Sequence, residues 1–467
     1  MIAMTVQEIA DAVAGKILHL DPAREISEYP IIDSRSAQSG TFFIALSGET
    51  LDGADFVEDA ISQGATFAIT HKESESPSIV VKDVAAALLL LAKAARQRST
   101  ETEFIGITGS QGKTTTKELL GHILSTAGET VVPVGSFNNE IGVPLTILRC
   151  TSMTKYCVLE MGARHEGDLA RLSKIAQPQI GVVLVVGRAH LGEFGDQAAV
   201  ARAKGELIEN LNPGAIAILG KYDEFTPMMG RNRSDLTRIS FGESPDCKVR
   251  ASDIEMREGR AHFDLVTPAG RSAVSLRLLG AHQVANALAA AAVATALKIP
   301  LDTIAATLST AESTSKMRME LHDVGDFVLI DDSYNANPES MAAALSTLIL
   351  FAQERGGSSW AFLGKMHELG ESEAASHQEI GRLASELGID HLVAVGTDMY
   401  KVAGMNTFGS ELTSYHECSS QAEALEVARH IEPGDSILVK ASRAEKLDAL
   451  AREILTICTE RSTEVEE

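Results

Sequence analysis

The chain has 467 residues, of which 45% are apolar and 22% charged, values that are typical of ordered globular proteins and argue against disorder. Its 41 basic and 64 acidic side chains give a formal net charge of −23, which disfavours broad binding to nucleic acid or to an anionic membrane, because both require a basic surface. At about 150 residues per domain, the length predicts three domains.

No segment has the pattern of a targeting or membrane signal. The first 15 residues contain Glu8 and Asp11 and lack a basic region before an apolar core, and the apolar runs are too short to span a bilayer. The five cysteines are scattered without a CxxC motif, which favours reduced, structural thiols. We therefore expect a cytoplasmic protein.

The first zone, residues 1–98, is predicted to form a small α/β domain. Apolar residues recur at helical spacing in three segments, 6–13, 56–63 and 83–98. Short strand-like runs are expected at 29–32, 41–46, 65–70 and 78–81.

The second zone, residues 99–313, alternates strands with helices. Apolar strands are expected at 104–108, 156–161, 180–186 and 215–219. Helices are expected at 114–127, 166–175, 198–211 and 282–297. This alternation indicates a central domain with a parallel sheet covered on both faces. Segment 231–280 has short alternating strands and is predicted to be a small antiparallel insertion.

The third zone, residues 314–467, repeats the alternation and is predicted to be a second doubly wound, Rossmann-like α/β domain. Strands are expected at 327–331, 360–363, 391–395 and 436–439. Helices are expected at 340–352, 374–387, 421–430 and 444–455. The acidic tail 459–467 is expected to fray.

The clearest chemical signal is a glycine-rich turn between the first strand and first helix of the central zone. Residues 106–116 read Gly-Ile-Thr-Gly-Ser-Gln-Gly-Lys-Thr-Thr-Thr. In this context backbone N–H groups surround phosphate oxygens, Lys113 can reach the β- and γ-phosphates, and the Thr114 hydroxyl can join a Mg²⁺ shell. The alternative, an ordinary glycine turn before a capped helix, fits the strand–loop–helix order less well.

Three further polar residues are expected near this phosphate loop. Glu160 ends a strand, His190 follows the next strand, and Lys204 lies in a helix. Each one alone is typical of a structural residue: a strand-end charge, a capping or core histidine, or a solvated helix face. They become candidates because all three are expected at the sheet edge that carries the phosphate loop.

Several segments resemble the Mur ligases, the ATP-dependent amide ligases of peptidoglycan precursor synthesis. The similar segments are 108–118, Phe-Asn-Asn-Glu-Ile-Gly-Val-Pro-Leu-Thr at 137–146, Glu-Met-Gly-Ala at 160–163, and His282 with Asn286. Segment 331–338, Asp-Asp-Ser-Tyr-Asn-Ala-Asn-Pro, is the most discriminating. It is similar to that of members that add D-alanyl-D-alanine to UDP-N-acetylmuramoyl tripeptide. The Asp-Asn-Pro-Arg motif of the diamino-acid-adding members is absent from the sequence.

The resemblance implies a three-domain enzyme. Residues 1–98 would bind the UDP substrate, 99–313 would bind ATP, and 314–467 would bind the acceptor. The ligase would transfer the γ-phosphoryl group to a substrate carboxylate, and the amine of D-alanyl-D-alanine would then attack the acyl phosphate. The implied partners are these two substrates, with no nucleic acid or membrane, and the chain is expected to be a monomer.

The resemblance also implies roles for individual residues. The implied catalytic residues are Lys113, Lys204 and His190, with Lys204 carbamylated to support a second Mg²⁺. The implied Mg²⁺ ligands are Thr114, Glu160 and His190. The residues implied at ATP are Gly109, Ser110, Gln111, Gly112, Lys113, Thr114, Thr115, Asn286, Arg318, Asp332 and Asn335. The residues implied at the other substrates are Ser34, Arg35, Gly48, Asp52, Gly53 and Asn337.

The sequence departs from the family pattern at Leu184-Val185, at Gly192-Glu193 and at Lys365. Three alternatives stay open at this point. One is a nucleotide-binding protein without catalysis, the second is an ATPase coupled to a partner, and the third is a Mur-type ligase with a different acceptor.

Overall fold

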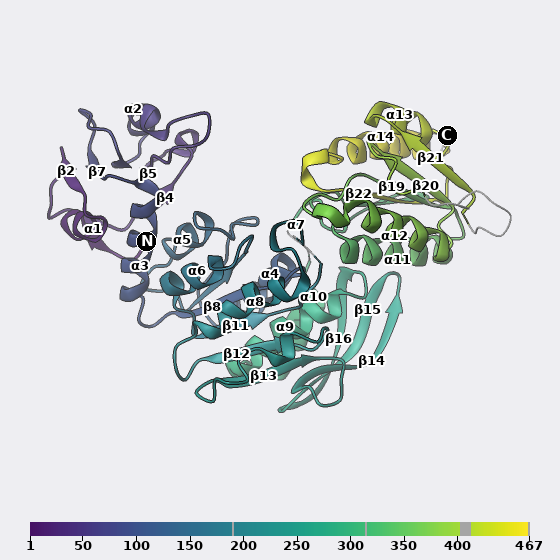
Figure 1. The fold of residues 1–467 in the computed structure, drawn as a ribbon, viewed down its shortest axis with the longest axis horizontal. Coiled ribbons are helices and arrows are strands. Elements are labelled where there is room, and N and C mark those ends of the chain that lie inside the picture. Colours follow the sequence, from purple (N-terminus) through teal and green to yellow (C-terminus); the bar gives the residue numbers. More distant parts are fainter. Residues whose placement is uncertain (189–190, 313–314, 402–411, 466–467) are drawn as a thin grey trace.

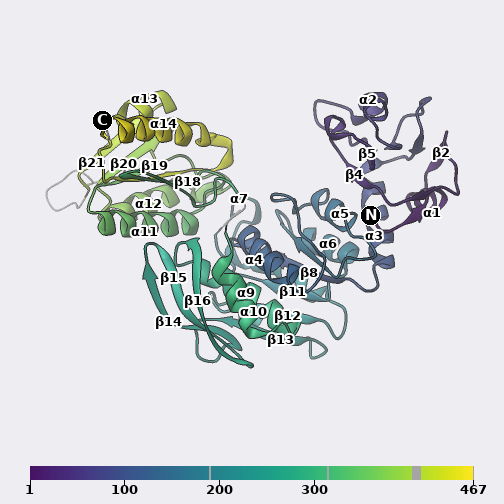
Figure 2. The same ribbon diagram turned by 180° about the vertical axis from the view of Figure 1, so that it is seen from behind.

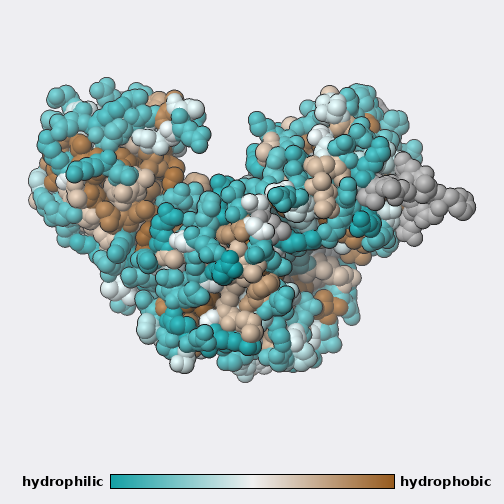
Figure 3. Space-filling view, viewed as in Figure 1, coloured by the Kyte–Doolittle hydropathy of each residue, from teal (hydrophilic) through white to brown (hydrophobic). Residues whose placement is uncertain are grey.

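The computed structural model describes residues 1–188, 191–312, 315–401 and 412–465. The described residues form three units, each built on its own sheet. The first and third units lie on the same side of the central unit, at its two ends (Figures 1 and 2). The space-filling view shows the open hollow between these two end units (Figure 3). This architecture confirms the predicted α/β class.

The described strands of the first unit form a five-stranded sheet in the order β2-β7-β6-β5-β4. Only the β2–β7 pair is antiparallel. The strands are β2 (Lys16–Leu18), β4 (Tyr29–Ile31), β5 (Thr41–Ile44), β6 (Ala68–Thr70) and β7 (Ser78–Val80), with β1 (Met4–Thr5) and β3 (Glu25–Ile26) paired beside them. The helices are α1 (Val6–Val13), α2 (Val57–Ser62) and α3 (Val84–Arg98), close to their predicted positions.

Helix α3 connects the first unit to the central one by packing against both. Its buried Leu88 and Leu91 belong to one apolar cluster with Phe42 of the first sheet and with Phe104 and Leu172 of the central unit. The alanine- and leucine-rich pattern that predicted this helix therefore covers two cores.

The central unit has a nine-stranded sheet among the described residues, in the order β16-β15-β14-β13-β12-β11-β8-β10-β9. The parallel strands are β8 (Glu103–Thr108), β9 (Thr130–Val131), β10 (Tyr156–Glu160), β11 (Ile180–Val183), β12 (Ile216–Gly220) and β13 (Thr237–Gly242). The last three are β14 (Val249–Arg257), β15 (Arg260–Thr267) and β16 (Gly270–Leu279). Because β14 pairs in parallel with β13, the predicted antiparallel insertion is instead a continuation of the main sheet.

Helices cover both faces of the central sheet, as its continuous apolar strands predicted. One face carries α4 (Lys113–Ser125), α9 (Gln283–Ala296) and α10 (Leu301–Thr310), whose buried residues share one cluster. The other face packs against α3 together with α5 (Gly142–Ile147), α6 (Asp168–Ala176) and α8 (Gln197–Glu209), while the short α7 (Leu191–Phe194) lies beside α8. Nearly every residue of the alanine-rich α9 is buried, since small side chains let it approach the sheet closely.

The third unit has a six-stranded sheet among its described residues, in the order β17-β18-β22-β19-β20-β21. The strands are β17 (Glu320–Val324), β18 (Phe327–Asp332), β19 (Ser359–Leu363), β20 (His391–Val395), β21 (Ser414–Cys418) and β22 (Ser436–Lys440). Helices α11 (Pro338–Arg355) and α12 (Glu373–Glu386) cover one face, and α13 (Gln421–Ala428) and α14 (Asp448–Val465) cover the other (Figure 1). The expected fraying of the tail is wrong for residues 459–465, which continue α14.

None of the described helices is both long and apolar enough to cross a membrane.

Candidate active site

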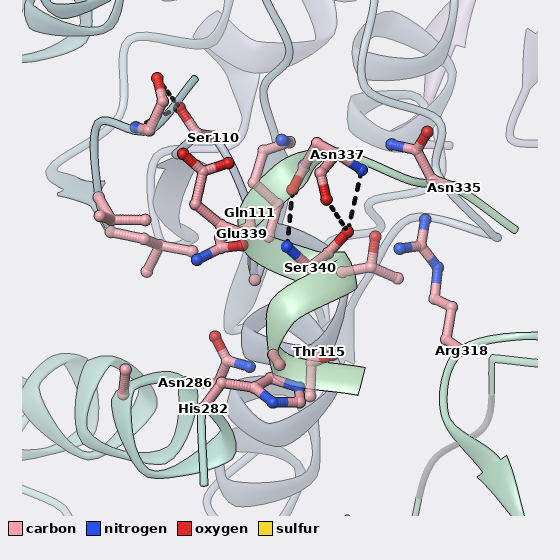
Figure 4. Close-up of a pocket in the computed structure, with 18 of the residues that line it drawn as sticks. Ser110, Gln111, Thr115, His282, Asn286, Arg318, Asn335, Asn337, Glu339 and Ser340 are labelled. Atoms are coloured by element: carbon pink, nitrogen blue, oxygen red, sulfur yellow. Dashed lines mark hydrogen bonds between the residues drawn. The ribbon is translucent and has the colours of Figure 1, made fainter. Parts of the chain in front are cut away.

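A pocket of about 930 Å³ lies where the third unit approaches the carboxyl edge of the central sheet (Figure 4). The phosphate loop, the ends of β10 to β13, the start of α9, and the segment between β18 and α11 line it. In parallel α/β sheets this edge is where ligands bind. The structure therefore brings two of the predicted motifs, residues 109–115 and 331–338, to one cavity.

The phosphate loop is held in place by hydrogen bonds to the segment that follows β11. The Ser110 N–H donates to the Val185 carbonyl (2.9 Å), and the Gly187 N–H donates to the Ser110 hydroxyl (2.8 Å). Gly112 adopts φ +81°, and a Cβ there would lie 2.2 Å from Asn286 Oδ1, so only glycine fits. The first turn of α4 follows directly, and its unpaired N–H groups make this point an anion site.

Lys113 and Glu160 are two of the charged residues that line the pocket. Lys113 Nζ donates to the Gly109 carbonyl (2.7 Å), and burial lowers the pKa of Lys113 while Glu160 partly offsets that effect. Glu160 is 1% exposed, and its carboxylate accepts from the Thr114 hydroxyl (3.0 Å) and from Asn138 Nδ2 (2.9 Å). The predicted neighbours of the triphosphate therefore lie together.

The donor set at this point fits Mg²⁺, which prefers oxygen ligands. Glu160 supplies a buried carboxylate and Thr114 a hydroxyl within hydrogen-bond distance of it. His190 lies outside the described residues. The described residues include no cluster of three or more His, Cys, Asp or Glu side chains suited to a metal, so a bound Mg²⁺ would complete its shell with ATP oxygens and water.

Lys204 lies on α8 and lines the same pocket. It is 2% exposed. Burial, and then the charge of Lys113, lower the pKa of Lys204 to about 7. A substantial fraction of this amine is therefore neutral near neutral pH, and a neutral amine is a nucleophile.

Two buried polar atoms of lining residues lack hydrogen-bond partners among the described residues. They are Nδ1 of His282 and the hydroxyl of Tyr222. Buried polar groups in native structures are normally hydrogen-bonded, so groups of this kind are expected to meet a ligand.

The third unit contributes an ordered polar wall. Lys440, only 1% exposed, donates to Asp332 Oδ2 (2.6 Å) and to the Asn335 carbonyl (2.8 Å). The Arg318 guanidinium lies 4.0 Å from the centre of the Tyr334 ring. All five of these residues line the pocket. The predicted contacts of Arg318, Asp332 and Asn335 with ATP stay predictions.

Asn337 also lies at this wall, but its side chain is already engaged. Its Oδ1 accepts from the Ser340 N–H (2.9 Å), and the Ser340 hydroxyl accepts in turn from the Asn337 N–H (3.0 Å). Figure 4 shows this reciprocal pair at the start of α11. The clear role of Asn337 is therefore to cap this helix, and its predicted contact with substrate stays a prediction.

The predicted residues of the first unit do not line this pocket: Ser34, Arg35, Gly48, Asp52 and Gly53. They lie instead on a surface of the first unit. Asp52 pairs with Lys72 (2.8 Å), and the hydrogen bond from Lys72 holds the pKa of Asp52 at about 2. Their role in binding stays a prediction.

Several residues around the pocket were not predicted. Ser136, Lys117, Arg188 and Glu339 are examples. Ser136 directly precedes the recognised 137–146 segment, so a signal for it was available. Arg188 had none, because its partners Glu339 and Glu379 lie 151 and 191 positions away in the sequence.

At two of the positions where the sequence departs from the family pattern, the structure shows specific contacts. The Gly192 N–H donates to the Glu368 carbonyl (3.1 Å), and a Cβ at 192 would lie 2.8 Å from Gly370 N. Gly192 therefore allows α7 to touch the third unit backbone to backbone. Lys365 forms an ion pair with Glu373 (3.1 Å).

Comparison with known proteins gives the same family over most of the chain. Residues 31–100 match the Mur ligase family catalytic domain, 107–294 the Mur ligase middle domain, and 317–443 the Mur ligase glutamate ligase domain. The UDP-N-acetylmuramoyl-tripeptide–D-alanyl-D-alanine ligase of Mycobacterium tuberculosis is 37% identical over 97% of both chains.

Solved structures of members of the same family are similar to this chain over nearly its full length. The crystal structure of MurF from Acinetobacter baumannii has a TM-score of 0.87 and 35% identity, covering 97% of this chain and 99% of that one. MurF ligase from Thermotoga maritima in complex with ADP has a TM-score of 0.79 and 25% identity, covering 94% and 99%.

Proposed function

The chain belongs to the Mur ligase family, and we propose that it joins D-alanyl-D-alanine to UDP-N-acetylmuramoyl-tripeptide, using ATP, to make the pentapeptide precursor of peptidoglycan. It is an ATP-dependent ligase, EC 6.3.2.10. The observation that carries this proposal is the full-length similarity to ligases of that name. The pocket supports it, because it unites the phosphate loop with segment 331–338.

The presence of three separate sheets supports three domains, each with its own binding role. In this proposal residues 1–98 bind the UDP substrate, residues 99–313 bind ATP, and residues 314–467 bind the acceptor dipeptide. The hollow between the two end units lies over the central unit, where the substrates would have to meet (Figure 3).

The chemistry follows from the poor electrophilicity of a carboxylate. An oxygen of the tripeptide carboxylate attacks the γ-phosphorus, and ADP leaves. The dipeptide amine then attacks the acyl carbon, phosphate leaves, and the amine loses a proton. Lys113 is placed to stabilise charge on the transferring group, as are the N–H groups of the phosphate loop. Thr114 and Glu160 would hold Mg²⁺, which when bound further offsets the negative charge.

Lys204 has a separate proposed role as a carbamate. Addition of CO₂ to its neutral amine would give a carbamate and release one proton, turning a neutral group beside Lys113 into an anion. The burial and the lowered pKa of Lys204 support this proposal. We expect Lys204→Ala to be inactive and to recover partly when a short carboxylic acid is added. Intact-protein mass spectrometry at high CO₂ supplies a readout that does not depend on turnover.

The deciding experiment measures phosphate release from ATP with UDP-N-acetylmuramoyl-tripeptide, with and without D-alanyl-D-alanine. Release that requires both, with a product of the joined mass, supports the proposal. Release without the dipeptide would favour a coupled ATPase. No release would favour a nucleotide-binding protein without catalysis. Release with another amino acid alone would favour a relative with a different acceptor.

We further propose that the protein acts as a monomer in the cytoplasm. All five cysteines are buried free thiols, which supports a reducing compartment.

A further inference from the structure

Lys117 is a buried cation that the proposed chemistry does not use. It lies on α4, one turn after Lys113, and is 2% exposed. Its Nζ donates to the carbonyls of Pro133 and Gly135, both at 2.8 Å, while the nearest carboxylate, that of Glu118, is 4.0 Å away. Burying an ammonium is costly unless its donors are satisfied, so this arrangement ties the 133–135 backbone firmly to α4.

The tied backbone belongs to the loop that runs from β9 to α5 and carries two side chains into the pocket. Asn138 donates to the Glu160 carboxylate (2.9 Å). The Ser136 hydroxyl lies 3.5 Å from the Thr114 hydroxyl and accepts from the Arg318 guanidinium (3.0 Å). The loop thus orients the carboxylate and hydroxyl that fit a metal ion.

The loop has few other anchors. Arg149 donates to the Val132 carbonyl (2.8 Å) before it, and the Gly162 N–H donates to the Asn138 carbonyl (2.8 Å) at its end. Between these points, Val134 is 61% exposed. Lys117 therefore supplies the contacts that hold the middle of the loop.

Glu118, the residue after Lys117 on α4, contacts the second chain segment that reaches this part of the pocket, the one that carries Arg318. Glu118 accepts a hydrogen bond from the Ser315 hydroxyl, just before Arg318. Lys117 and Glu118 consequently fix the two chain segments whose side chains, Ser136 and Arg318, meet over the phosphate loop.

We propose that Lys117 is a positioning residue of the nucleotide site, which acts by holding the 133–138 loop so that Asn138 orients Glu160 and Ser136 stays between Thr114 and Arg318. This inference rests on the proposed function only in that Mg²⁺ and ATP bind here. Lys117 does not line the pocket, so its effect passes through the loop.

The test is calorimetric binding of ADP with and without Mg²⁺, which needs no ligase substrate. In Lys117→Met, ADP affinity with Mg²⁺ is expected to fall by between about tenfold and a hundredfold, as when a group that orients a metal ligand is removed. Affinity without Mg²⁺ is expected to change by less than about threefold, because the loop amides are untouched. Hydrogen exchange of amides 134–138 is expected to rise. Equal losses in the two conditions would overturn the proposal.

Two further variants sharpen the result. Lys155→Met is the matched control, since Lys155 also donates to a backbone carbonyl, that of Ala127 (3.0 Å), but lies on the surface outside the pocket. Asn138→Ala should reproduce the Mg²⁺-specific loss even if Lys117→Met fails to fold. The double variant should lose no more than either single one, and additive losses would refute the proposed route. If wild-type protein binds no ADP at all, the proposed function fails instead.

Discussion

Arg188 of the central unit joins Glu339 and Glu379 of the third unit. Its N–H and Nε contact Glu339 Oε1 at 2.9 and 3.3 Å, and its guanidinium donates to both oxygens of Glu379, at 2.7 and 3.1 Å. Glu339 lines the pocket. Arg188 directly follows Gly187, whose N–H donates a hydrogen bond to the Ser110 hydroxyl of the phosphate loop. The charge pair therefore secures the third unit beside the phosphate loop.

Breaking this pair should slow turnover more than it weakens ADP binding. The Arg188 and Glu379 side chains are 39% and 47% exposed, so solvent screens them, and we expect Glu379→Gln to cost about 1 kcal/mol or less. That corresponds to a loss of at most about fivefold in kcat/KM. Steady-state kinetics at low and high salt measures it. Arg202→Ala breaks the surface pair with Glu166 (2.9 Å) and is the control, expected to be silent. A Glu379→Gln effect that is unchanged by salt would argue against a charge pair.

Lys113→Ala should abolish phosphate release. Lys113 is the lysine of the phosphate loop that we propose stabilises the transferring phosphoryl group, and removing a group that stabilises transition-state charge costs at least about a hundredfold in kcat. The measurement is phosphate release with both substrates saturating, beside a circular dichroism spectrum that shows folding is intact. Rates near those of the wild-type protein would remove Lys113 from the mechanism.

Short sequence motifs predicted those parts of the site whose residues lie close together in the sequence. The phosphate loop needs only a strand, a glycine turn and a helix, so residues 109–115 could be placed from the pattern alone. Asp332 and Asn335 came from a short motif. Contacts such as Lys117 with the Pro133 carbonyl depend on tertiary structure, which no periodicity encodes.

The predictions of the fold failed where the sequence pattern was weak or where tertiary contacts decide the structure. Helix α5 was missed because Gly142–Ile147 is a six-residue segment with Pro144 and β-branched residues, a composition that does not favour helix. Strands were expected in segment 231–280, but their alternating pattern does not show whether they join the main sheet or form a separate one. The parallel β13–β14 pairing decides that, through contacts at Phe241 and Gly242.

Gly192→Ala should separate α7 from the third unit. A Cβ at this position would lie 2.8 Å from Gly370 N, and backbone atoms cannot yield without moving one of the units. Displacing packed groups costs about 1–3 kcal/mol, so we expect kcat to fall by roughly tenfold. ADP affinity should stay within about twofold, because the phosphate loop is untouched. If ADP affinity and kcat fell together, the damage would lie in the central unit and not at this contact.

Acidification should destabilise the third unit through its histidines. His391 stacks on Trp360, the chain's only tryptophan, at 3.8 Å, and burial lowers the pKa of His391 below its usual 6.5. A histidine whose folded-state pKa is lowered binds protons more readily when unfolded. Its stabilising contribution is therefore full above about pH 6.5 and is lost as the pH falls through that value.

Burial lowers the pKa of His377 and of His416 in the same direction, so their contributions add to this loss. Asp33 and Asp246, each with a pKa of about 2, act in a separate window below about pH 4. Urea unfolding at pH 7.5 and 5.5, followed by the emission of Trp360, should show a smaller free energy of unfolding at pH 5.5. His391→Phe keeps the stacked ring but cannot be protonated, so it should reduce the difference between the two pH values. An unchanged difference would mean that His391 does not contribute to it.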